Sequence, residues 1–169
     1  MRELLLALAC LIAAPSIATA QDLNRIELGT HELSEMKTLN GVRLVFDPTK
    51  ILMAYALPRS SGRGFVTNIM GLAGGPQEID EPADSLLERL NLKPYFVALT
   101  LPDGVPVWVK TSAISFFRSI EPWDHIRAEA KTAVSTGGPP IFVKESVATI
   151  KDAINAMRRQ NKDQGETHP

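Results

Sequence analysis

A turn and a strand are encoded together in the stretch Leu101-Pro102-Asp103-Gly104-Val105-Pro106-Val107-Trp108-Val109. Proline presets φ and glycine accepts a positive φ, so Pro-Asp-Gly is typical of a tight turn. The valines at positions 105, 107 and 109 alternate, which places them on one face of an extended chain. The stretch therefore predicts a β-hairpin, with strands at residues 95–100 and 105–109.

Residues 39–91 follow the same pattern as residues 101–155. Each has a turn, an alternating strand, further β segments, a Gly/Pro turn, a short strand and an apolar helix with an acidic start. The aligned positions are Asn40-Gly41-Val42 with Asp103-Gly104-Val105, Leu44 with Val107, Phe46 with Val109, Ile51 with Ile114, Gly74-Gly75-Pro76 with Gly138-Pro139-Pro140, Ile79 with Val143, Glu81 with Glu145, Leu86 with Ile150 and Leu90 with Ile154. Few of these aligned residues are identical. The evidence for an internal repeat is therefore the shared order of turns, strands and helix. The alternative is that two unrelated β–β–α stretches share ordinary patterning.

A known family shows this order of features. The first half carries Leu39-Asn40-Gly41, Asp47-Pro48, Ile51, Gly74-Gly75, Glu81 and Leu86, and the second half carries Val143-Lys144-Glu145-Ser146 before a helix. In this the chain resembles the small flagellar-operon FlbD-like (SwrD-like) family. The resemblance implies two tandem copies of the family's module and transfers no catalytic residue. Family members are usually single-unit and cytoplasmic, so a flagellar role is not transferred to this doubled chain.

The expected fold class is α+β, with two tandem β-rich modules of short antiparallel strands, each closed by one C-terminal helix. We place the modules at residues 36–91 and 95–159, joined by residues 91–94. Modules near 60 residues bury only about 60% of their unfolded surface. We therefore expect the two modules to share a core or to pair edge strands.

The remaining elements are predicted from turn residues and hydrophobic spacing. Further strands are expected at residues 36–39, 42–46, 51–57, 65–72, 77–79, 114–120, 131–135 and 141–144. Residues 121–129 form either a loop or a single helical turn. Asp80 is expected to cap the first helix. Ser146 is expected to cap the last helix, whose apolar face is Val147, Ile150, Ile154 and Met157 and whose last turn holds Arg158 and Arg159.

Residues 1–20 have the pattern of a secretory signal peptide. An apolar core at residues 4–14 ends at Pro15, and Ala18-Thr19-Ala20 is a small-x-small cleavage site. A membrane anchor is disfavoured because the core is well short of the ~20 residues that span a bilayer. A lipoprotein interpretation would use Cys10, which has a poor approach sequence. We expect cleavage after Ala20, a periplasmic or secreted protein, a linker at residues 21–35 and a disordered tail at residues 160–169.

The composition excludes several classes of function. The net charge is −1, which argues against nucleic-acid binding. Cys10 is the only cysteine and leaves with the leader, so no disulfide and no thiolate metal site is expected. We expect no transmembrane segment after the leader is cleaved.

No catalytic, cofactor-binding or metal-binding residue is predicted. The three histidines, His31, His125 and His168, fall in the linker, a loop and the tail, whereas such sites need partners that converge from ordered elements. The glycine-containing loop at residues 60–64 could hold an anion through its backbone. It lacks the Lys-Ser/Thr ending of a phosphate loop, so a hairpin loop is favoured.

Candidate interface residues lie in two loops: Trp123, His125 and Arg127, with Arg59 and Arg63. Trp123 is either a contact residue or buried under its loop. Trp108 is expected in the core. Phe116 and Phe117 are adjacent on a strand, so one of them faces away from its own core. That residue is either covered by the other module or an exposed anchor.

Three hypotheses for function follow. The first is an exported, non-enzymatic protein that binds or scaffolds an envelope protein partner. The alternative is a periplasmic protein that binds a small molecule or an envelope polymer in a cleft between the modules. An enzyme is the third, and it would need titratable groups that converge from both modules.

Overall fold

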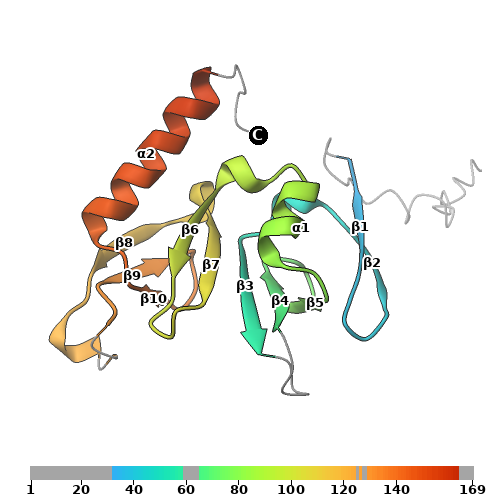
Figure 1. Cartoon of the computed structure of the whole chain (residues 1–169), viewed down its shortest axis with the longest axis horizontal. Helices are drawn as coiled ribbons and strands as arrows, with labels where there is room; N and C mark the ends of the chain where they lie inside the picture. The colour runs from blue at the N-terminus through green and yellow to red at the C-terminus, as the bar shows by residue number, and fades with distance from the viewer. Residues whose placement is uncertain (1–31, 59–64, 125, 127–128, 164–169) are drawn as a thin grey trace, which may run out of the picture. The chain divides into compact units, whose positions relative to one another are not determined.

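A computed structural model of the chain describes residues 32–58, 65–124, 126 and 129–163 (Figure 1). The chain divides into two units, Met1–Thr30 and His31–Pro169, and every described element belongs to the second. The predicted leader and most of the predicted linker lie outside the described residues. Within the described residues, no helix combines the length and the apolar character needed to span a membrane.

The described chain is α+β, with three small antiparallel sheets and two helices. The first half contains β1 (Ser34–Lys37), β2 (Arg43–Phe46), η2 (Pro48–Lys50), β3 (Met53–Pro58), β4 (Phe65–Met70), β5 (Gln77–Ile79) and α1 (Ala83–Arg89). After η3 (Lys93–Tyr95), the second half contains β6 (Phe96–Thr100), β7 (Pro106–Lys110), η4 (Thr111–Ala113), β8 (Phe116–Ser119), η5 (Pro122–Asp124), β9 (Thr132–Ser135), β10 (Ile141–Val143) and α2 (Val147–Asp163). The predicted class of short antiparallel strands with a C-terminal helix is confirmed.

The central sheet has five strands in the order β5-β4-β3-β7-β6, and it joins the two halves (Figure 1). Strand β3 of the first half pairs with β7 of the second, with Ala54 opposite Trp108. The other two sheets are the β1–β2 hairpin and the three strands β10-β9-β8. The expected pairing between the halves is therefore present as one shared sheet.

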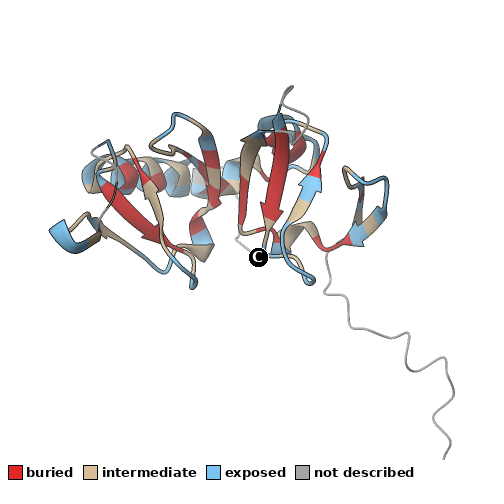
Figure 2. Ribbon diagram, turned by 90° about the horizontal axis from the view of Figure 1, so that it is seen from below, coloured by how far each residue is buried: buried red, intermediate tan, exposed pale blue. Residues whose placement is uncertain are grey.

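Two hydrophobic clusters pack on opposite faces of the central sheet. Neighbouring residues of a strand point to opposite faces, and β6 accordingly sends Phe96 into the first cluster and Val97 into the second. The first cluster contains Met36, Phe46, Ile51, Ile69, Ile79, Leu86, Leu87, Leu92 and Phe96. The second contains Met53, Val97, Leu99, Val107, Val109, Val134, Val143, Ile150 and Ile154. Figure 2 shows buried segments mainly along the strands, whereas exposed segments lie on turns and also on parts of the helices and outer strands.

Strand registers in the two halves correspond pair by pair. Met36 opposite Leu44 in β1–β2 matches Leu99 opposite Val107 in β6–β7. Ala54 opposite Ile69 in β3–β4 matches Phe117 opposite Val134 in β8–β9, and Thr67 opposite Ile79 in β4–β5 matches Thr132 opposite Val143 in β9–β10. The same positions therefore face the core in each half.

A buried threonine makes the same hydrogen bond in each half. The Thr67 hydroxyl donates to the backbone oxygen of Glu81, and the Thr132 hydroxyl donates to that of Glu145 at 2.7 Å. Both threonines are almost fully buried. The two bonds fasten the middle strand of each half to the segment that precedes its helix.

Replacing either buried threonine by valine is expected to lower the free energy of unfolding by about 1–3 kcal/mol. Valine keeps the shape of Thr67 or Thr132 but leaves the carbonyl of Glu81 or Glu145 without its donor. Urea unfolding followed by circular dichroism measures both variants. An unchanged free energy of unfolding in Thr132→Val would contradict the assigned hydrogen bond.

Helix boundaries correct two sequence predictions. Helix α1 begins at Ala83 with Pro82 at its N-cap, so Asp80 is not the cap. The residue before a proline disfavours the helical region, which keeps Glu81 out of the helix. Helix α2 runs to Asp163 rather than ending at Arg159. Asn161 explains the extension, because it is buried and donates its amide to the Pro94 oxygen at 3.1 Å.

Several other local predictions are confirmed or adjusted. The Ser146 hydroxyl caps α2 by accepting the Thr149 N–H at 3.1 Å, as expected. Strand β1 begins at Ser34, inside the predicted linker. The predicted joint at residues 91–94 is held in place, because Leu92 is buried and its N–H donates to the Leu87 oxygen at 2.8 Å.

Candidate functional site

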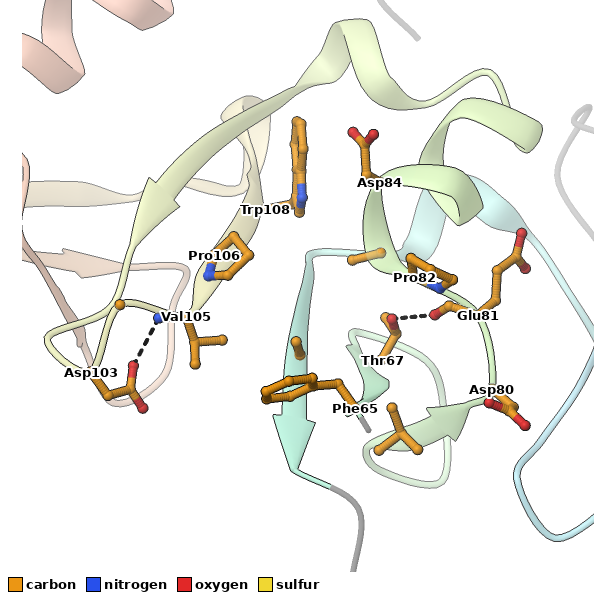
Figure 3. Close-up of a pocket in the computed structure, with 14 residues that line it drawn as sticks. Phe65, Thr67, Asp80, Glu81, Pro82, Asp84, Asp103, Val105, Pro106 and Trp108 are labelled. Carbon is orange, nitrogen blue, oxygen red and sulfur yellow. Dashed lines mark hydrogen bonds between the residues drawn. The ribbon is translucent and has the colours of Figure 1, made fainter. Parts of the chain in front are cut away.

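An apolar pocket of about 730 Å³ lies on the face of the central sheet that carries Trp108. Figure 3 shows Val105, Pro106 and Trp108 on one side of it. The opposite side is formed by Phe65, Thr67 and Pro82, from β4 and the approach to α1. The two walls come from different halves of the chain. Its volume lies within the range of typical ligand pockets, roughly 300–1,000 Å³.

The hollow results from a small residue on the strand between the two walls. Ala56 of β3 lines the pocket and contributes only a methyl group, whereas its neighbours across the sheet carry larger side chains. Ala54, two residues earlier on the same face, lies directly opposite Trp108. The small side chains of β3 therefore leave an unfilled space between Trp108 on one side and Phe65 on the other.

The β6–β7 turn and the α1 approach are held by hydrogen bonds (Figure 3). Gly104 has a φ of 89°, which a glycine adopts without strain, and the Val105 N–H donates to Asp103 Oδ1 at 3.1 Å. On the other wall, the Thr67 hydroxyl donates to the Glu81 oxygen. Both walls are thus fixed by contacts inside the protein.

Acidic side chains line the edge of the pocket: Asp80, Glu81, Asp84 and Asp103. Arg89 Nη2 lies 2.6 Å from Glu81, and the hydrogen bond that Arg89 donates to Glu81 raises the pKa of Arg89. Lys93 Nζ lies 2.7 Å from Asp84 and 5.7 Å from the centre of the Trp108 ring. The hydrogen bond that Lys93 donates to Asp84 raises the pKa of Lys93. Lys93 therefore stays charged beside the indole ring, where a cation is favoured.

A second, smaller hollow of about 420 Å³ lies beside β5. Its lining includes Asn40, Asn68 and Glu78. Asn68 is buried, and its Oδ1 is a side-chain oxygen without a hydrogen-bond partner among the described residues. Such an oxygen is normally satisfied by water or a ligand.

The titratable side chains that line the main pocket are the carboxylates Asp80, Glu81, Asp84 and Asp103. The residues that line it include no histidine, cysteine, serine or lysine. Among the residues that the structure describes, no group of three or more His, Cys, Asp or Glu could hold a metal ion. The pocket is built for apolar contact.

Of the interface residues singled out from the sequence, the structure describes only Trp123, and Trp123 does not line this pocket. Trp123 lies in η5 with 68% of its surface exposed, so the alternative of burial under its loop is wrong. His125, Arg127, Arg59 and Arg63 lie outside the described residues, as do the loop at 60–64, His31 and His168.

The sequence predicts Trp108 in the core, and the structure places it partly in the wall of the pocket. It is half-buried, packs against the first cluster and also lines the pocket. Its alternation with Val107 and Val109 was the available signal, because it places the indole on the face away from the valines.

No protein-family model matches the chain, and no curated protein and no solved structure matches it either.

Proposed function

We propose that this chain is a non-enzymatic binding protein that takes an extended, apolar segment of an envelope protein into the pocket beside Trp108. The observation that carries the proposal is the wall chemistry of the pocket, with Trp108 and Pro106 facing Phe65 and Pro82. Flat aromatic and proline surfaces are the chemistry with which proteins take up extended, proline-containing segments. The acidic edge favours segments that also carry basic side chains.

Binding is a better use of this pocket than catalysis. Glu81 and Asp84 are held by Arg89 and Lys93, and Asp103 accepts a hydrogen bond within its own turn. A general acid or base must instead reach the reacting group. Three of the four carboxylates that line the pocket are therefore already engaged within the protein.

We place this activity in the periplasm or outside the cell, on the basis of the signal-like residues 1–20. We also propose that the chain is a tandem pair of FlbD-like modules. The pairwise correspondence of strand registers supports the duplication. The duplication would explain why the pocket draws one wall from each half.

A small apolar molecule or an envelope polymer is the second candidate for the ligand. The pocket volume of about 730 Å³ favours this candidate, because it suits a drug-sized molecule. The site would then be the cleft between the halves that the sequence suggested.

Tryptophan fluorescence tests both candidates, because the chain holds only Trp108 and Trp123. In a Trp123→Phe background, Trp108 is the sole reporter and lies in the pocket wall. The probes are a ten-residue peptide of valine, proline and lysine, the same peptide with glutamate for lysine, and the uncharged dye N-phenyl-1-naphthylamine. We expect saturable quenching or blue-shift with the lysine peptide, and affinity at least about tenfold weaker for the glutamate peptide.

Ala56→Met is the pocket-filling variant, because Ala56 forms the low floor. It is expected to weaken peptide binding by about tenfold or more. Ala148→Met, at an exposed position of α2, is the matched control and should bind normally. Binding of the dye alone, lost in Ala56→Met, would favour the small-molecule candidate. Absence of a response to all three probes would contradict both.

A further inference from the structure

Strands β2 and β8 each have an edge without a partner strand among the described residues, whereas the equivalent strands of the other half, β7 and β3, pair with each other. Strand β2 pairs with β1, and β8 pairs with β9, and among the described residues neither has a second partner strand. By register, β2 corresponds to β7, and β8 corresponds to β3. Strands β3 and β7 pair with each other inside the chain.

We propose that β8 of one copy pairs with β2 of the next copy, as β3 pairs with β7 within the chain. The internal pairs are Met53 with Val109, Ala54 with Trp108 and Tyr55 with Val107. The corresponding pairs between copies are Phe116 with Phe46, Phe117 with Val45 and Arg118 with Leu44. The interface joins two different edges, so it propagates as an open chain or closes into a ring.

Exposed apolar side chains mark both edges. Met53 is 5% exposed because it packs into the second cluster, whereas its counterpart Phe116 is 50% exposed. Trp108 is half-buried, whereas its counterpart Val45 is 54% exposed. An added strand would cover Phe116 and Val45 as the internal pairing covers Met53 and Trp108. Of the two adjacent phenylalanines, Phe116 is therefore the one that faces away from its own core, whereas Phe117 packs against the second cluster.

A second copy of this chain is the partner that these edges fit. The internal junction shows that an edge of the β3 type and an edge of the β7 type pair antiparallel in this register. The charges on the edges are neutralised locally. Arg118 pairs with Asp124 at 2.7 and 2.8 Å, and Arg43 pairs with Glu35 at 2.5 Å.

Sedimentation velocity from micromolar to millimolar concentration tests the assembly. The wild-type protein is expected to show an average mass that rises with concentration and passes twice that of the monomer. Val45→Glu and Phe116→Glu should each remain monomeric, because each places a charge at one of the two edges. Their equimolar mixture should form a one-to-one dimer and nothing larger, because each variant retains the edge that the other lacks.

The same variants also test the alternative in which β2 pairs with β2, or β8 with β8, of another copy. In that case one of the two variants would still dimerise alone. Ala156→Glu, at an exposed position of α2, is the control with the same added charge and should assemble as the wild type does. Circular dichroism checks each fold, and the lysine variants at positions 45 and 116 replace any variant that unfolds. A wild-type monomer at millimolar concentration, self-association of a single variant, or a monomeric mixture would overturn the proposal.

Discussion

Gly71→Ala is expected to destabilise the protein by about 3 kcal/mol or more, from a strained φ and a steric clash together. Gly71 follows β4 with a φ of 108°, which side-chain-bearing residues rarely adopt. A Cβ at this position would overlap the Lys50 backbone oxygen and lie 2.6 Å from Leu52 Cγ and 2.8 Å from Leu52 N. Because one of these contacts is with a backbone oxygen, no change of rotamer relieves it.

Gly74→Ala is the matched control for this substitution. Gly74 has a φ of 94°, but an added Cβ would meet nothing within 4 Å. Its cost should therefore be the backbone strain alone, about 1–2 kcal/mol. Urea unfolding of the two variants gives the difference between them, which measures the close approach of Gly71 to Lys50 and Leu52. Equal losses in the two variants would contradict that close approach.

Leu86→Ala and Ile150→Ala are each expected to cost about 2–5 kcal/mol, because each empties space in a packed core. Leu86 is fully buried in the first cluster and Ile150 in the second. The central sheet packs against both clusters, so we expect each variant to shift a single cooperative transition. Trp108 fluorescence in the Trp123→Phe background and far-ultraviolet circular dichroism should give coincident curves.

The two variants also decide whether the halves fold together. Two separate transitions, with Leu86→Ala moving only one of them, would contradict the shared sheet as the unit of folding. Leu87→Ala is a second probe of the first cluster, because it too is fully buried on α1. The loss of stability in Leu87→Ala should shift the same single unfolding transition.

Features that depend on neighbouring residues were predicted well. Asn40-Gly41 and Asp103-Gly104 turn their hairpins, with φ of 81° at Gly41 and 89° at Gly104. Ser146 caps α2, and Ile150 and Ile154 are buried on its inner face. Turn chemistry, capping and hydrophobic period act within a few residues, so they can be recognised in one sequence. Asp80 does not cap α1, because Pro82 disfavours the helical region at Glu81 and the helix begins only at Ala83.

Local patterns in the chain specify the order of the elements, their short antiparallel character and the alternating faces of the strands. Packing between distant segments sets the pairing of β3 with β7, the hollow that Ala56 leaves beside Trp108, and the exposure of Phe116 rather than Phe117. It also extended α2 through the contact of Asn161 with Pro94. Each of these outcomes depends on residues far apart in the chain. Propensity and periodicity report local preference, whereas strand partners and pockets follow from which distant surfaces pack together.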